Sequence, residues 1–271
     1  MNKVILCSEE DPASLNIRER LIESFGFRED SSTMFGNPIY RRGDIRIITV
    51  NRPSIYADEE VSGIDAGLIV VASKHVSEAG VKAVLSHPVG NWGEKAEFGG
   101  RPRALAVTSA RAVFAAVSRL RSLLEDAGLT GWDVGMEATH HGPYSEKPLL
   151  FVELGSSPAE WSDPKMGEIV AEACLAACAA ERVNVPEIAV GFGGGHYTPR
   201  FTPLVLQEKV AFGHVAPKYH FPLSSEMIRE AFEKTVERPK LAYIDWKGIN
   251  SEQRQRLLEE LSGIGVEYVR L

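Results

Sequence analysis

The sequence contains little cysteine. Only three cysteines, Cys7, Cys174 and Cys178, occur in 271 residues, too few for a disulfide framework and typical of a protein kept in a reducing compartment. Cys174 and Cys178 lie four residues apart in an alanine-rich stretch, where free cysteine usually packs as a small apolar side chain. We assign these thiols no function.

Long apolar runs are also missing. The start, MNKVILCSEE, has no apolar stretch leading to a small-residue cleavage site, and no window approaches the ~18 consecutive apolar residues of a membrane span. We therefore expect a cytosolic protein that makes no membrane contact.

Positive charge is in deficit, with a formal net charge of −7. Any contact with nucleic acid must therefore come from a local basic patch and not from the overall field. The chain also lacks a GxSxG elbow, an HExxH helix and a CxxC pair, which argues against a serine hydrolase, a zincin and a zinc finger.

The pattern that is present is an alternation of short β-branched runs with longer amphipathic segments, typical of an α/β fold. Residues 3–8 predict a strand, and a helix follows with Asp11 as N-cap and Pro12 at its first position. Residues 38–51 predict a hairpin that turns at 42–44, so the sheet should be mixed. No low-complexity linker interrupts the alternation, and we expect one α/β domain over residues 1–271.

Histidines gather in the second half of the chain, at or just past the ends of expected strands. Binding sites in open α/β sheets form where strand ends meet loops. The five histidines placed in this way, of seven in the chain, are His140, His141, His196, His214 and His220.

The segment EATHHGP, residues 137–143, combines a carboxylate with two adjacent histidines. Neighbouring residues of a strand point to opposite faces, so both histidines can reach one ligand only if the strand has already ended, as Gly142 and Pro143 suggest. One histidine would then bind a metal or move a proton while the other orients it or contacts substrate, and Glu137 would accept a proton or fix a tautomer. The alternative is a surface turn with two incidental histidines.

Two further segments carry histidine. GFGGGHYTPR, residues 191–200, presents backbone amides before His196, which suits an oxyanion or a phosphate, although a plain glycine-rich turn is the alternative. GHVAPKYH, residues 213–220, places His214 and His220 six apart, which is no zinc-motif spacing. By itself that segment favours a solvated loop.

Two segments offer partners for these histidines. Glu153 lies inside an apolar strand, FVELGSS, where a carboxylate needs a partner, such as one of the histidines. Residues 86–103 predict a long glycine-rich loop beside the site, and its Arg101 and Arg103 could contact phosphate.

At EATHHGP, FVELGSS, GFGGGHYTPR and GHVAPKYH, in that order, the sequence resembles the archaeal and plant type of D-aminoacyl-tRNA deacylase, and the resemblance covers essentially the whole chain. It implies a three-layer α/β/α sandwich with a mixed sheet, of the phosphorylase/hydrolase kind and similar in core to peptidyl-tRNA hydrolase. It also implies zinc as cofactor, and hydrolysis of the ester that joins a D-amino acid to tRNA. No obligate protein partner is implied, and a chain of this size can act as a monomer.

Ester hydrolysis needs an activated water and stabilisation of an oxyanion. Our hypothesis is that His140, His196 and either His214 or His220 bind zinc. Glu137 or Glu153 would be a supporting partner or the proton acceptor, with His141 beside them. The remaining expected contacts are the amides of Gly193, Gly194 and Gly195 for the oxyanion, and Arg101, Arg103, Arg200 and Lys218 for tRNA phosphates.

Two other functions remain open at this point. One is a different metal-dependent hydrolase such as an aminopeptidase, which would prefer a peptide amide to the ester on tRNA. The other is a non-catalytic module that binds RNA or a nucleotide, which would turn over no aminoacyl ester.

Overall fold

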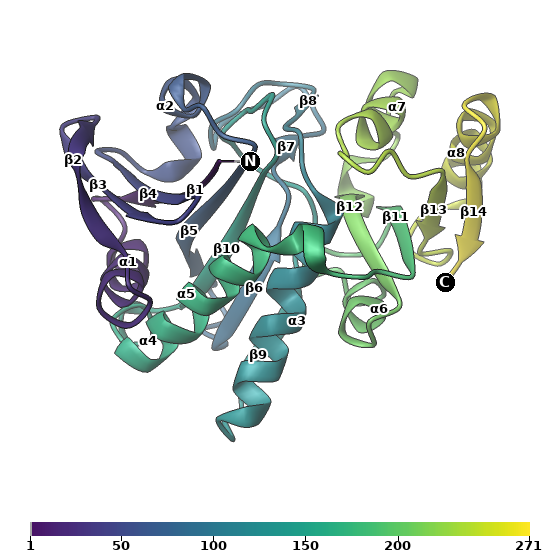
Figure 1. Cartoon of the computed structure of the whole chain (residues 1–271). Coiled ribbons are helices and arrows are strands. Elements are labelled where there is room, and N and C mark those ends of the chain that lie inside the picture. The colour runs from purple at the N-terminus through teal and green to yellow at the C-terminus, as the bar shows by residue number, and fades with distance from the viewer. Residues whose placement is uncertain (1) are drawn as a thin grey trace.

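The computed structural model describes residues 2–271, and its largest element is an eight-stranded mixed sheet (Figure 1). The strands, in spatial order, are β2 (Arg28–Met34), β3 (Asn37–Arg42), β4 (Ile45–Val50), β1 (Lys3–Ser8), β5 (Leu68–Val76), β10 (Leu149–Ser156), β6 (Ala83–His87) and β9 (Asp133–Met136). Strands β4, β1, β5 and β10 are parallel neighbours, whereas β6 runs antiparallel to β10. The expected mixed sheet is confirmed.

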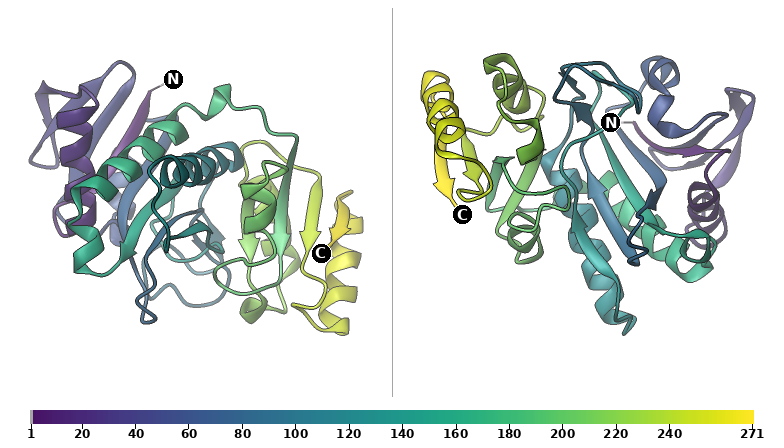
Figure 2. Two further views of the ribbon diagram at one scale, coloured as in Figure 1. Left: turned by 90° about the horizontal axis from the view of Figure 1, so that it is seen from below. Right: turned by 180° about the vertical axis from the view of Figure 1, so that it is seen from behind.

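A second, four-stranded sheet lies beside the first, and all of its strands are parallel (Figure 2). Its order is β12 (Val210–Ala216), β11 (Glu187–Phe192), β13 (Leu241–Ile244) and β14 (Glu267–Arg270). A short antiparallel ribbon consists of β7 (Gly90–Asn91) and β8 (Ala104–Leu105). The alternation in the sequence predicted strands in these four places, but not their separation into a second, parallel sheet.

Helices cover both sheets. One face of the large sheet is covered by α1 (Pro12–Ser24), α3 (Ala110–Asp126), α4 (Pro158–Trp161) and α5 (Pro164–Cys178), and the other by η1 (Ser54–Tyr56) and α2 (Asp58–Gly63). The second half adds η2 (Ala180–Arg182), α6 (Thr202–Leu206), η3 (Lys218–His220), α7 (Ser225–Glu233) and α8 (Ser251–Gly263). The expected mixed α/β architecture, with helices flanking a large mixed sheet, is confirmed.

Helix α3 joins the two sheets, because it packs against α5 and also against β12. One continuous buried core accordingly includes Ile5 of β1 and Phe212 of β12. The expectation of a single domain over residues 1–271 stays a prediction.

Local sequence signals explain where the helices begin. Asp11 accepts a hydrogen bond from the Ser14 amide and caps α1, which starts at Pro12 as expected. Ser109 caps α3 in the same way by accepting from the Ala112 amide. None of the helices in residues 2–271 is both long and apolar enough to cross a lipid bilayer.

One expected boundary is wrong. Residues 86–103 were expected to form a loop throughout, but Ser86 and His87 end strand β6 and pair with β10. The run AVLSH is only five residues long, and its end resembles a loop because it is polar: His87 faces the site, and the Ser86 hydroxyl donates to the Phe151 carbonyl.

Candidate active site

Polar side chains replace apolar ones at one end of the large sheet. Residues two apart on a strand share a face, so His75 lies on the same face of β5 as the core residue Val71, and Glu153 on the same face of β10 as Phe151. His87 of β6 lies opposite Phe151 in the register of β10 and β6. Three neighbouring strands therefore deliver titratable groups to one place.

The segment after β9 adds further groups from between the two sheets. The Ala138 amide donates to the His196 carbonyl at 2.7 Å, so the segment is bonded to the loop that follows β11. Because β9 ends at Met136, His140 and His141 need not point to opposite faces, and their ring centroids lie 4.3 Å apart.

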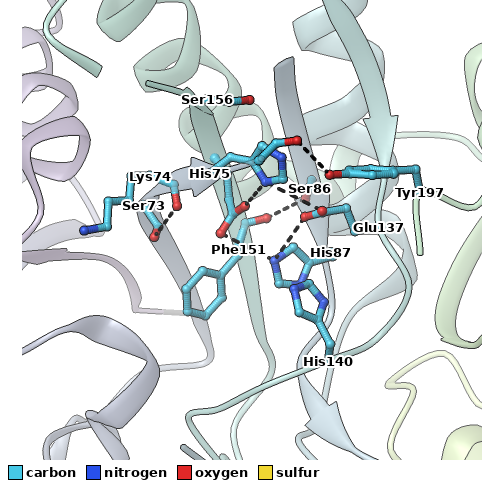
Figure 3. Close-up of polar contacts among 12 residues, drawn as sticks. Ser73, Lys74, His75, Ser86, His87, Glu137, His140, Phe151, Ser156 and Tyr197 are labelled. Atoms are coloured by element: carbon cyan, nitrogen blue, oxygen red, sulfur yellow. Dashed lines mark hydrogen bonds and ion pairs between the residues drawn. The ribbon is translucent and has the colours of Figure 1, made fainter. Parts of the chain in front are cut away.

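Together these elements form what we call the Glu–His cluster, part of which is drawn in Figure 3. Its members are His75, His87, Glu137, His140, His141, Glu153 and His196.

Glu137 is the least satisfied group of the cluster. It is 1% exposed, and neither of its carboxylate oxygens has a hydrogen-bond partner among the described residues. The nearest ring nitrogens are His196 Nε2 at 3.0 Å and His75 Nδ1 at 3.6 Å from Oε1, and His87 Nε2 at 3.8 Å from Oε2. A buried carboxylate without hydrogen bonds is costly, so a cation fits here.

Glu153 is held by two histidines. His75 Nδ1 lies 3.3 Å from its Oε2, and His87 Nε2 lies 3.5 Å from its Oε1. Burial raises the pKa of Glu153, but the hydrogen bonds and charges of His75 and His87 outweigh burial and bring this pKa below its usual value. Burial likewise lowers the pKa of both histidines, and the two glutamates raise it above the usual value. Glu153 is therefore the charged partner that positions these two rings.

Three imidazoles share one tautomer. The Nδ1 of His87, His140 and His141 faces the carbonyl oxygens of Pro88, Ala138 and Gly142, respectively. A carbonyl can only accept, so each Nδ1 carries the proton. The Nε2 atoms of His140 and His141 are left as potential metal ligands, whereas that of His87 faces the Glu153 carboxylate.

The pKa values of His140 and His141 favour metal binding. Burial, and then the imidazoles of His87, His141 and His196, lower the pKa of His140 well below its usual value. Burial lowers the pKa of His141 to about 3. Both rings are therefore neutral near pH 7, the state that metal binding requires.

Three overlapping groups in the cluster could each hold a metal ion, with ligand atoms within 4.8 Å of one another. They are His87 with His140 and His141, Glu137 with His140 and His196, and His75 with Glu137 and Glu153. The mixture of imidazole and carboxylate ligands is the set that zinc takes in catalytic sites.

Two cavities reach the cluster. The first, of about 380 Å³, exposes Glu137, Glu153 and His196 at its wall. The second, of about 440 Å³, shares His140 and His141 with the first. The side chain of His196 is 34% exposed, and its Nδ1 lies 3.2 Å from the Tyr219 hydroxyl, so His196 stands at the mouth of the site.

The structure thus brings together Glu137, His140, His141, Glu153 and His196 of the expected residues. It also adds His75 and His87, which sequence reasoning did not assign. The available signal was a polar residue at the end of a buried apolar strand, LIVVASKH for His75 and AVLSH for His87.

His214 does not belong to the cluster. It is fully buried on β12, where Nδ1 contacts the Thr139 hydroxyl at 3.1 Å and Nε2 faces the Ala106 carbonyl at 3.1 Å. With both ring nitrogens engaged in the core it cannot be a ligand, so the hypothesis fails at this residue. His220 is half-buried at the second cavity and outside the three potential ligand groups of residues 2–271.

The glycine loop after β11 offers fewer amides than expected. The Gly193 amide donates to the Ala216 carbonyl at 2.8 Å and is no longer available. A Cβ at Gly248 would approach the Gly194 nitrogen to 2.6 Å, so the Gly194 amide faces residue 248. The Gly195 amide, next to His196, has no acceptor among residues 2–271.

The expected basic residues differ in availability. Arg101 stacks on the Tyr144 ring, with its Cζ 4.0 Å from the ring centroid, and Arg103 forms an ion pair with Glu94. Arg200 and Lys218 are exposed and have no ion pair within the described part of the chain.

Comparison with known proteins places this geometry in a family context. A family model described as D-aminoacyl-tRNA deacylase matches residues 62–269. Proteins named D-aminoacyl-tRNA deacylase from Thermococcus kodakarensis and Pyrococcus furiosus are 42% and 39% identical to this chain, each over 99% of both chains. A crystal structure of a conserved protein of unknown function superposes with a TM-score of 0.88 at 35% identity, covering 99% of this chain and 95% of that one.

Proposed function

Since the chain belongs to the D-aminoacyl-tRNA deacylase family and hydrolyses the ester bond of D-aminoacyl-tRNA, we propose that this hydrolysis takes place at the Glu–His cluster with the help of zinc. The single observation that carries the proposal is the buried carboxylate of Glu137, whose two oxygens lack hydrogen bonds among the described residues while imidazoles surround them. Family membership favours ester hydrolysis over a peptidase or a non-catalytic RNA-binding module.

Zinc would be held by Glu137, His140 and His196, the group that lies nearest the mouth of the site. Such an ion supplies a Lewis acid that polarises a carbonyl or acidifies water. The Nε2 atom of His141 extends the same set of potential ligands on the inner side.

The surrounding residues would orient these groups. Glu153 holds His75 and His87 in place, and the Tyr219 hydroxyl fixes the ring of His196. The Gly195 amide is the backbone donor that we propose for the developing oxyanion.

The acceptor end of tRNA would reach the site past exposed cations. Lys218 and Arg200 lie on the loops that follow β12 and β11, close in sequence to Tyr219 and His196, and would contact phosphates. Arg101 would contribute from the opposite loop, while Arg103 would first have to leave Glu94. We also propose that the protein works in the cytoplasm, where tRNA is aminoacylated and where its three buried thiols stay reduced.

Substitution of Glu137 tests the proposal. Glu137→Gln keeps the shape of the side chain but removes its charge, so we expect loss of bound zinc and a fall in kcat of roughly 10²–10⁴-fold. Metal content by mass spectrometry and deacylation of D-aminoacyl-tRNA are measured on the same sample. Glu78→Gln, an exposed carboxylate just after β5, is the matched control and should change neither. A Glu137→Gln protein with wild-type zinc content and rate would refute the assignment.

A further inference from the structure

The second cavity has no role in the chemistry described so far, although it adjoins the cluster. Its volume is about 440 Å³, within the range of small-molecule sites. The loop residues Asn91 and Phe98 line it together with His220, and His140 and His141 line both this cavity and the first.

Phe98 is the unusual side chain of this cavity. It is 63% exposed, although burying an aromatic ring is strongly favourable. It also lines the first cavity, so the ring stands between the two. An exposed ring at the junction of two cavities is available to a ligand.

The backbone that carries Phe98 is fixed. The Phe98 carbonyl accepts from the Gly142 amide at 2.9 Å, directly beside His141. The next residue, Gly99, has φ +79 and lies so close to Ile55 that a Cβ would meet its carbonyl oxygen at 1.7 Å. Asn91 donates to the Gly99 carbonyl at 2.9 Å. The backbone from which the ring projects is therefore held at a set position relative to the cluster.

Rigid exposed aromatic rings are the usual platforms for unpaired bases, since every base offers a π-face. The substrate end that carries the ester is an unpaired nucleoside. Resting on the proposed function, we propose that the second cavity binds the 3′-terminal nucleoside of the tRNA, with its base stacked on Phe98 and the His220 ring on the opposite wall.

This placement also determines where the ester and the aminoacyl side chain lie. The ester must lie at His140 and His141, which line both cavities. With the nucleoside in the second cavity, the aminoacyl side chain enters the first, between Pro53, Ile55 and Val76. His220 thereby has a role in binding substrate in place of the metal ligation expected from the sequence.

Phe98→Ala tests the proposal, because the side chain is exposed and its loss leaves the core intact. We expect a KM for D-aminoacyl-tRNA that is about tenfold higher, the typical loss for one stacked base, with kcat little changed. Hydrolysis of a D-tyrosine ethyl ester, which has no nucleoside, should be unaffected. Phe98→Trp keeps the stacking surface and should restore the wild-type KM. Tyr268→Ala, on the distant edge strand β14 with a 40% exposed ring, is the matched control.

A second measurement separates this proposal from the proposed function. Binding of the trinucleotide CCA to the protein is followed by calorimetry and should weaken by about the same factor in Phe98→Ala but not in Tyr268→Ala. If the wild-type protein binds CCA through Phe98 but releases no amino acid, the proposed function fails and the nucleoside site stands. Equal losses on D-aminoacyl-tRNA and on the ethyl ester, or unchanged CCA binding in Phe98→Ala, would overturn the nucleoside site.

Discussion

Glu137 determines the character of the site at the scale of single residues. Its carboxylate is buried, so its charge requires compensation, yet the surrounding imidazoles approach without completing a hydrogen bond. The buried carboxylate of Asp11, by contrast, accepts from the amides of Ser14 and Lys74. The contrast between the two acids marks Glu137 as the group that is suited to a cation.

His214 is the buried histidine whose titration can be predicted. Burial lowers its pKa in the folded protein to about 3, whereas in the unfolded chain the value is ~6.5. Below pH ~6.5 the unfolded chain therefore binds a proton that the folded protein does not, and the free energy of unfolding falls as the pH falls toward 3. Between pH 7 and pH 5 this single residue should cost about 2 kcal/mol.

His214→Gln tests this linkage, because glutamine does not titrate and can still hydrogen-bond. Urea unfolding at pH 7, 6 and 5 should show that the free energy of unfolding falls less steeply with falling pH in the variant than in the wild type. The difference in slope should correspond to nearly one proton taken up on unfolding. Contributions from the other titrating groups cancel in the comparison. Parallel pH profiles for the two proteins would contradict the prediction.

Most residues of the cluster that could be placed from sequence follow the visible end of a strand, and Glu153 was placed because a carboxylate inside an apolar strand needs a partner. Glu137, His140 and His196 follow strands and come together as the strand-end rule implies. His214 was misplaced because it lies within β12, where both ring nitrogens are used in the core. His75 and His87 were missed because each belongs to a strand and not to the loop after it. Only the face of the sheet to which each residue points shows that its ring reaches the site.

At the scale of elements, caps and turns made most boundaries predictable. Asp11 with Pro12 begins α1 as expected, and Ser109 caps α3. Gly43, with φ +59, occupies the turn between β3 and β4. Strand β2 was not expected, because REDSSTM is polar throughout and its residues are mostly exposed at the edge of the sheet. An edge strand that buries nothing leaves no hydrophobic pattern to detect.

Helix α3 has a second cap that comes from a distant part of the chain. The Glu237 carboxylate accepts hydrogen bonds from the Ser109 hydroxyl at 2.8 Å and from the amides of Ala110 and Arg111 at 3.0 and 3.1 Å. Its negative charge also lies at the positive end of the helix dipole. The segment before β13 is tied in this way to the helix that packs between the sheets.

We expect Glu237→Ala to lower the free energy of unfolding by about 1–2 kcal/mol. Urea unfolding measures the change, and Glu233→Ala, an exposed glutamate on α7, is the control that should lie within about 0.5 kcal/mol of the wild type. A Glu237→Ala protein as stable as the control would show that the cap contributes nothing.

On the scale of the whole molecule, the site lies where the two sheets meet. The large sheet supplies His75 and His87, which Figure 3 shows, and also Glu153, and the loop after β11 of the small sheet supplies His196. The sequence indicated the α/β class and the mixed sheet, but the separation into two sheets depends on the pairing of distant strands, which no local pattern encodes. The cluster therefore requires both sheets to be folded and docked.

The central claim, metal-assisted and D-selective hydrolysis at the Glu–His cluster, is tested most directly by one assay. Deacylation of matched D- and L-aminoacyl-tRNA is measured before and after chelation, with bound zinc quantified in each sample. We predict selective release of the D-amino acid, its loss on chelation and its recovery when zinc is restored. Undiminished release from protein that has lost all of its metal would contradict the account.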